Sequence, residues 1–111
     1  MGYMELFVVM DRSILGRGVF AVFSSIEKAQ SFSDDMYRNT RFQCEVKTCP
    51  LIGGSDVPGR VYAAHFYDDF YDTHVFDGIY SESNLAYDAV GGKGLIIRFV
   101  IDSPEDKEII A

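Results

Sequence analysis

The sequence predicts an α+β domain made of two ββαβ units with a pseudo-twofold relation, with about six mostly antiparallel strands and two helices on one face of the sheet. Three observations support this fold class. The 111 residues suit one ordinary domain, and 48% of them are hydrophobic, as in globular proteins. Short apolar runs alternate with segments of helical periodicity. The same order of segments occurs twice along the chain.

A local resemblance marks the two copies. Residues 23–29 (FSSIEKA) resemble residues 80–86 (YSESNLA), and each segment follows two short apolar runs. A half of about 50 residues buries too little surface to fold alone, so the two copies should share one core. We therefore expect a single domain over residues 1–111, with repeat 1 at about 4–50, a linker at 51–59, repeat 2 at about 60–104 and a C-terminal tail at 105–111.

The first repeat has the pattern strand, turn, strand, helix, strand. Apolar runs at 6–10 and 19–22 predict two strands, and the glycines of the turn at 15–18 adopt positive φ at little cost. Residues 24–27 (SSIE) form a capping-box pattern, which predicts the start of a helix that should end near residues 38–39. Apolar and polar residues then alternate over 42–49, which predicts a strand with one solvent-facing side.

The second repeat has the same pattern with a longer hairpin connection, at 68–73, between apolar runs at 61–65 and 75–79. A helix over roughly 81–90 should end before two glycines that suit a helix C-cap. Residues 95–101 are almost continuously apolar, which predicts a central strand buried on both faces. Residues 103–106 (SPED) predict either a last helical turn or a frayed end.

The net charge of −7 lies entirely in the second half of the chain. Residues 1–55 carry as many bases as acids, whereas residues 56–111 carry eleven acids and four bases. A nucleic-acid-binding protein needs a basic surface that displaces counterions from phosphates, and a polybasic membrane-surface module needs one as well. Neither direct nucleic-acid binding nor membrane binding is therefore expected.

The cysteines and the apolar runs indicate a cytoplasmic protein. No apolar run approaches the ~18 residues that a membrane helix needs, and the N-terminus lacks the features of a signal peptide. Cys44 and Cys49 are five residues apart on a predicted strand, which would separate them by ~16 Å, too far for a disulfide. Two reduced thiols are typical of a cytoplasmic protein.

The most conspicuous segment is 65–77 (HFYDDFYDTHVFD), which has four Asp, two His and five aromatic residues but no Lys or Arg. Imidazole and carboxylate groups are ligands of zinc, manganese and iron. One hypothesis is therefore a metal site, although the spacing matches neither known zinc patterns nor a calcium EF-hand. No other cofactor is expected. The candidate ligands are His65, Asp68, Asp72 and His74, with Asp69 and Asp77 nearby in the sequence.

The same segment also suits protein binding. Exposed Tyr and Phe rings supply anchors, and carboxylates beside them orient a basic partner. Alternatively, the aromatic residues fill a small core and the acids only keep the hairpin in water. The candidate partner-binding residues are Tyr67, Asp68, Asp69, Phe70, Tyr71, Asp72 and Asp77.

No motif predicts catalysis, which favours a non-enzymatic protein. Residues 91–94 (GGKG) follow a predicted helix, whereas a phosphate-binding P-loop precedes one and has a different spacing. Cys49 has no evident base to activate it, and the serines at 24 and 25 fit a helix cap better than a nucleophile. We assign no catalytic residues.

Residues 18–29 (GVFAVFSSIEKA) resemble part of a group of small uncharacterised bacterial and phage domains. The resemblance implies a small α+β domain and brings no catalytic residues with it.

Three hypotheses about function follow. The first is a non-enzymatic interaction protein, such as an inhibitor, immunity or anti-defence protein of a bacterium or phage, that binds a basic protein surface through its acidic, aromatic second half. The second is a metal-binding protein or metal-dependent enzyme that uses the hairpin at 65–77. The third is a small-molecule-binding domain with a pocket between the repeats. A homodimer is also considered, because an unpaired edge strand invites pairing.

Overall fold

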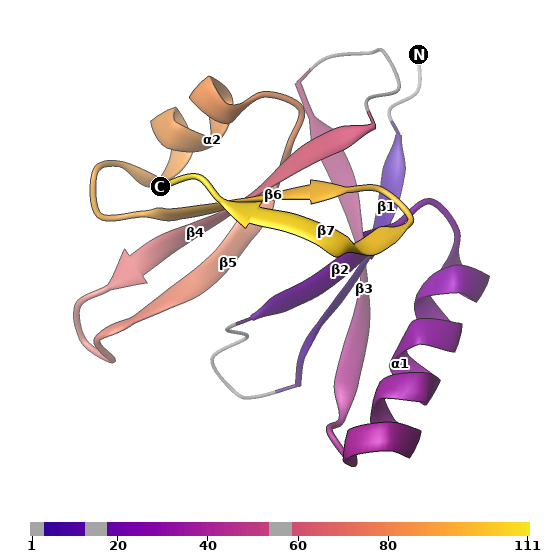
Figure 1. Ribbon diagram of the computed structural model, residues 1–111. Helices are drawn as coiled ribbons and strands as arrows, with labels where there is room; N and C mark the ends of the chain where they lie inside the picture. Colours follow the sequence, from indigo (N-terminus) through magenta and orange to yellow (C-terminus); the bar gives the residue numbers. More distant parts are fainter. Residues whose placement is uncertain (1–3, 13–17, 54–58) are drawn as a thin grey trace.

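The computed structural model describes residues 4–12, 18–53 and 59–111 of the chain. These residues form a strand-rich fold with two helices that lie apart from each other on its outside (Figure 1). In chain order the elements are β1 (Glu5–Asp11), β2 (Val19–Phe23), α1 (Ile26–Thr40), β3 (Cys44–Ile52), β4 (Arg60–Asp68), β5 (Thr73–Tyr80), α2 (Ser83–Val90), β6 (Leu95–Val100) and β7 (Ser103–Ile109).

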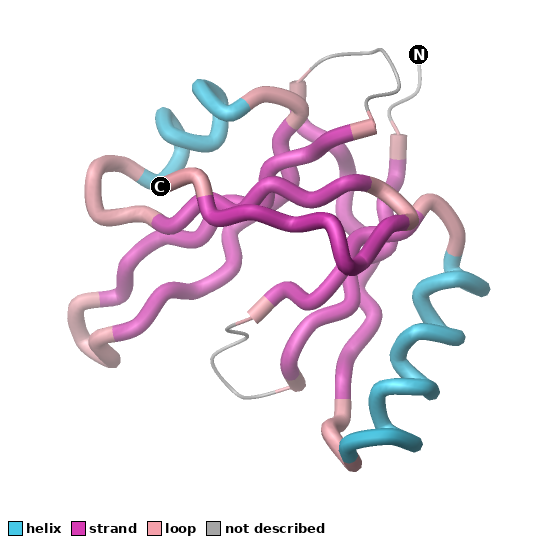
Figure 2. Tube along the Cα trace, viewed as in Figure 1, coloured by secondary structure: helices cyan, strands magenta, loops and turns pink. Residues whose placement is uncertain are grey.

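These strands belong to one sheet in the order β2-β1-β3-β5-β4-β6-β7. Neighbouring strands are antiparallel except β3 and β5, which run parallel. The sheet coils until its two edge strands, β2 and β7, come close together (Figure 2). There the Asp102 amide donates to the Val22 carbonyl at 3.0 Å, and Lys107 Nζ donates to the Phe20 carbonyl at 3.4 Å. The result is a nearly closed barrel.

The predicted fold class, an α+β domain of six strands in two ββαβ units with a pseudo-twofold relation, is wrong. The protein is mostly β, with strands over about half of the described residues. Residues 103–109, expected as a helical turn and a tail, form β7, which pairs with β6 in the register Ile97↔Ile109. Pairing prevails over the local helix-start signal because the free edge of β6 would otherwise expose a row of unpaired backbone groups. The twist of seven strands then coils the sheet toward closure.

Successive side chains of a strand point alternately into the barrel and outward, toward the helices. On β1, Leu6 and Val8 belong to the inner core, whereas Val9 packs with Ala29 of α1. On β4 the same alternation puts Ala64 in a third cluster, under α2. Apolar side chains thus fill the barrel. The other buried members of the inner core are Met10, Val19, Val22, Cys49, Leu51, Val61, Ala63, Ile79 and Phe99.

Helix α1 has a side-chain cap at its start and a left-handed residue at its end. The Ser25 hydroxyl accepts a hydrogen bond from the Lys28 amide at 3.3 Å, which satisfies one free donor of the first turn. The helix runs on to Thr40, slightly past its expected end. Arg41 follows with φ of 63° and donates its amide to the Tyr37 carbonyl at 2.8 Å. This cap positions the Arg41 side chain beside the last turn of the helix.

Two expected loops fall partly outside the described residues. The turn expected at 15–18 lies outside them except for Gly18, and residues 54–58 of the expected linker also lie outside. Leu51 and Ile52, expected in that linker, complete β3 instead. They do so because β3 finds a second partner in β5, so its pairing extends past the point where the local pattern ends.

Candidate functional site

The turn of the β4–β5 hairpin is held by two of its own aspartates. The Asp68 carboxylate accepts hydrogen bonds from the amides of Phe70 at 2.9 Å and Tyr71 at 3.2 Å. Asp72 has a left-handed φ of 53° and accepts a hydrogen bond from the Tyr67 hydroxyl. Side chains that bond their own turn in this way restrict its conformations. We call residues 68–72 the hairpin tip.

Two aromatic side chains of the hairpin tip are exposed to solvent. The exposed fraction is 85% for Phe70 and 56% for Tyr71. The two rings pack edge to face, with centroids 4.7 Å apart and an interplanar angle of 89°. The Asp69 side chain beside them is 83% exposed. The tip therefore presents a preformed aromatic pair next to an exposed carboxylate.

A lysine from another part of the chain supports the hairpin from the side. Lys93 lies in the turn between α2 and β6, and its ammonium group is 5.3 Å from the centroid of the Tyr67 ring and 3.7 Å from Asp69 Oδ1. Its carbonyl lies 3.0 Å from His74 Nε2, and the His74 ring packs against Tyr67 at 5.4 Å. The hydrogen bond to Asp72 raises the pKa of Tyr67, so this hydroxyl stays protonated. Sequence reasoning missed Lys93, because nothing local places residue 93 beside residue 67.

The remaining members of segment 65–77 lie away from the tip. His65 is 2% exposed, and its Nδ1 lies 3.2 Å from the Leu95 carbonyl. Burial lowers the pKa of His65, so the ring is neutral at pH 7. Asp77 accepts a hydrogen bond from the Tyr80 hydroxyl at 2.7 Å, and burial together with this bond raises the pKa of Tyr80 to about 12. The hairpin thus separates the buried His65 and the exposed Asp77 from the acids of its tip.

The four residues of the metal hypothesis do not form a ligand cluster. Within residues 4–12, 18–53 and 59–111, no group of three or more His, Cys, Asp or Glu side chains is arranged to hold a metal ion. His65 is buried in the sheet, Asp68 caps the turn, Asp72 bonds Tyr67 and His74 bonds a main-chain carbonyl. The metal site stays a prediction, and the geometry lends it no support.

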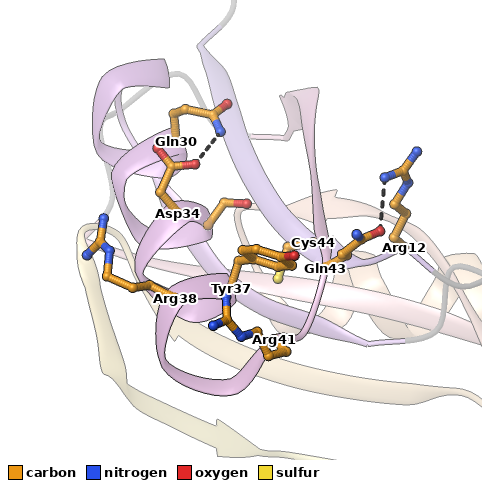
Figure 3. A pocket seen from close by; sticks show the side chains of 9 residues that line it. Arg12, Gln30, Asp34, Tyr37, Arg38, Arg41, Gln43 and Cys44 are labelled. Atoms are coloured by element: carbon orange, nitrogen blue, oxygen red, sulfur yellow. Dashed lines mark hydrogen bonds between the residues drawn. The ribbon is translucent and has the colours of Figure 1, made fainter.

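A second candidate site lies between α1 and the start of β3 (Figure 3). It is a groove of about 550 Å³, open to solvent, that three arginines help to line, and we call it the arginine pocket. Arg12 Nη1 donates to Gln43 Oε1 at 3.2 Å, and the Arg41 guanidinium carbon is 5.6 Å from the centroid of the Tyr37 ring. Further wall residues are Ser33, Asp34, Arg38 and Cys44.

Sequence reasoning missed the arginine pocket because its residues come from three elements. Arg12 follows β1, Arg41 follows α1 and Cys44 begins β3. The available signal was the group of bases at positions 38 and 41, which the neutral net charge of the first half conceals. Burial raises the pKa of Cys44, and so does the nearby Asp11. The thiol of the pocket is therefore protonated at pH 7 and is a poor nucleophile.

The seam between the two predicted repeats is the parallel pair β3–β5. Leu51 pairs with Ile79 there, and both side chains are buried. The predicted small-molecule pocket between the repeats remains a prediction, and this packed seam counts against it. The edge strands that a homodimer would need, β2 and β7, lie close to each other, and the dimer likewise stays a prediction. Cys44 and Cys49 are unpaired, as predicted.

Comparisons with protein-family models, with curated proteins and with solved structures found no match for this chain. The resemblance to small bacterial and phage domains therefore stays a prediction. Among the described residues, neither helix is long and apolar enough to cross a membrane. Function has to be inferred from the side chains themselves.

Proposed function

We propose that this protein is a non-enzymatic interaction module that binds a basic protein surface with the tip of its β4–β5 hairpin. The exposure of Phe70 and Tyr71 carries the proposal. Leaving a ring of this size in water forgoes ~2 kcal/mol of burial. A partner that covers both rings recovers that free energy, and aromatic anchors of this kind dominate binding at protein interfaces.

The hairpin tip is organised before any partner binds. The Asp68 carboxylate holds the amides of Phe70 and Tyr71, and the two rings hold each other at 4.7 Å. Fewer conformations are then lost on association, which lowers the entropic cost of binding. A turn that only connected two strands would need neither ring.

Charge indicates the kind of partner. Asp69 is exposed beside the rings, and the second half of the chain carries the whole net charge of −7. Lys93 contacts Asp69 at 3.7 Å, but its side chain is itself 77% exposed, so water screens the pair. A partner with a basic patch would be steered to this side of the molecule, and the association should weaken as salt is raised.

Binding of this kind needs no catalytic residue. An inhibitor, immunity or anti-defence protein works by covering a surface of its target, and we propose that this protein is one of bacterial or phage origin. The two free thiols support a cytoplasmic location for it.

Affinity capture from an extract of the source cell tests the proposal, with the wild type and the double variant Phe70→Ser, Tyr71→Ser as baits. Ile109→Ser is the matched control, because Ile109 is 67% exposed on β7, away from the tip. We expect a basic protein to bind the wild type and the control but not the double variant. The amount of this basic protein retained by the wild-type bait should fall as the salt concentration is raised from about 50 mM to about 500 mM. Equal retention by the double variant, or binding that salt leaves unchanged, would refute the proposal.

A further inference from the structure

The arginine pocket holds two guanidinium groups that pair with no carboxylate in the part of the chain that the structure describes. Among the described residues, Arg38 pairs with Asp35, whereas neither Arg12 nor Arg41 contacts an acid. One N–H group of Arg12 donates a hydrogen bond to the Gln43 side chain at 3.2 Å. A guanidinium has five N–H donors, so both groups keep donors for an anion. Phosphate suits such a group because a single arginine can bind two of its oxygens at once.

The backbone at Arg41 points to a use for its side chain. Its φ of 63° is a conformation that glycine adopts freely and that costs other residues ~1 kcal/mol. Glycine is the usual residue at this position of a helix end. Arginine there places a guanidinium against the Tyr37 ring at the mouth of the pocket. The Tyr37 ring restricts where that group points.

The pocket has two chemically different ends. Gln30 and Asp34 lie one turn apart on α1 and are joined by a hydrogen bond of 3.1 Å. Arg41 lies seven residues after Asp34, which places it ~10 Å further along the helix axis. The Arg12 and Arg41 side chains point apart, on either side of Tyr37 and Gln43 (Figure 3). Figure 3 shows Gln30 and Asp34 apart from the side chains of Arg12 and Arg41.

These two ends match a ligand with two kinds of group. The Arg41 guanidinium suits a phosphate, and the Asp34 carboxylate with the Gln30 amide suits hydroxyl groups, which donate to the acid and accept from the amide. The groove of about 550 Å³ exceeds a lone phosphate and lies within the range of small-ligand sites, roughly 300–1,000 Å³. We propose that the arginine pocket binds a small phosphorylated polyol of the sugar-phosphate class.

Calorimetry with ribose 5-phosphate, glucose 6-phosphate, free ribose and inorganic phosphate tests this proposal. We expect at least one sugar phosphate to bind saturably, and at least about tenfold more tightly than inorganic phosphate or ribose, because only the sugar phosphates contact both ends. Equal affinity for inorganic phosphate would reduce the pocket to a general anion site and overturn the proposal. Absence of saturable binding by both sugar phosphates would overturn it too.

Variants of pocket residues test whether the sugar phosphate binds in the arginine pocket. Arg41→Gly keeps the left-handed cap, so its thermal midpoint should equal or exceed that of the wild type while its affinity for the sugar phosphate falls at least about tenfold. Asp34→Asn should weaken the sugar phosphate without weakening inorganic phosphate. Lys47→Gln is the matched control, because it removes one exposed positive charge from β3 outside the pocket lining. Unchanged binding by Arg41→Gly, or an equal loss with Lys47→Gln, would show that the pocket is not the site.

Discussion

Asp102 ties the turn between β6 and β7 to the segment between β2 and α1, where the barrel closes. One carboxylate oxygen accepts from the Ser24 amide at 2.8 Å, and the other accepts from the Ser24 hydroxyl at 2.7 Å and from Lys28 Nζ at 3.1 Å. Asp102 also has a left-handed φ of 68°. These contacts join residues that are more than seventy positions apart in the chain.

We predict that Asp102→Ala lowers the free energy of unfolding by about 2.5 kcal/mol. Hydrogen bonds to a charged group contribute ~1.5–3 kcal/mol when buried, and the lower end applies because the carboxylate is 29% exposed. Alanine also adds ~1 kcal/mol of strain at a left-handed φ. The Asp102→Asn variant should lose about half as much free energy of unfolding, because asparagine tolerates this φ and its side-chain oxygen can still accept one hydrogen bond from Ser24. Urea unfolding at pH 7 measures both losses, with Glu105→Gln as the matched loss of an exposed acid on β7.

The pH dependence of the loss gives a second check. Partial burial raises the pKa of Asp102, but the hydrogen bonds from Ser24 and the charge of Lys28 outweigh it, and the pKa lies below its ordinary value of 3.8. A carboxyl with a lowered pKa stabilises the fold fully above its unfolded pKa and loses that contribution as the pH falls through the folded one. The difference between the wild type and Asp102→Asn should therefore be largest at pH 7 and smaller at about pH 3. A loss of less than about 0.5 kcal/mol for Asp102→Ala, or a difference that stays constant with pH, would refute the reasoning.

Two further predictions concern Gly53, directly after β3, and the buried His65. Gly53 has φ of 117°, and a Cβ there would lie 2.7 Å from Leu85 Cδ1, so Gly53→Ala should cost about 2–3 kcal/mol in urea unfolding. Gly92→Ala meets no atom within 4 Å and should cost less than about 1 kcal/mol; equal losses would contradict the steric argument. Burial lowers the pKa of His65 below 6.5 in the folded protein. As the pH falls, this histidine therefore binds a proton more readily in the unfolded chain than in the folded one, and the folded state loses stability. His65→Gln should lose less stability than the wild type between about pH 7 and about pH 5, and an identical slope would contradict this account.

Local signals in the sequence predicted most of the elements. The apolar runs at 6–10 and 19–22 became β1 and β2. The run at 95–101 became β6, but the expected burial on both faces is wrong, because only Ile96 and Phe99 of that strand are buried. The serine-rich segment before α1 marked the start of that helix, with Ser25 as its cap. These features depend on propensities, caps and periodicity within a few residues, so the sequence alone carries them. The uneven distribution of charge and the composition of segment 65–77 are likewise properties of the chain itself.

Only the tertiary structure decided what the strands enclose and which side chains meet. Ser103–Ile109 became a strand because the edge of β6 was free to pair, a condition that residues 103–106 do not encode. Pairing also split segment 65–77, because His65 lies inside the sheet while Phe70 reaches the turn. The arginine pocket arises where the ends of β1 and α1 meet the start of β3. Contacts of this kind depend on register between distant segments, and a shift of one residue exchanges the two faces of a strand.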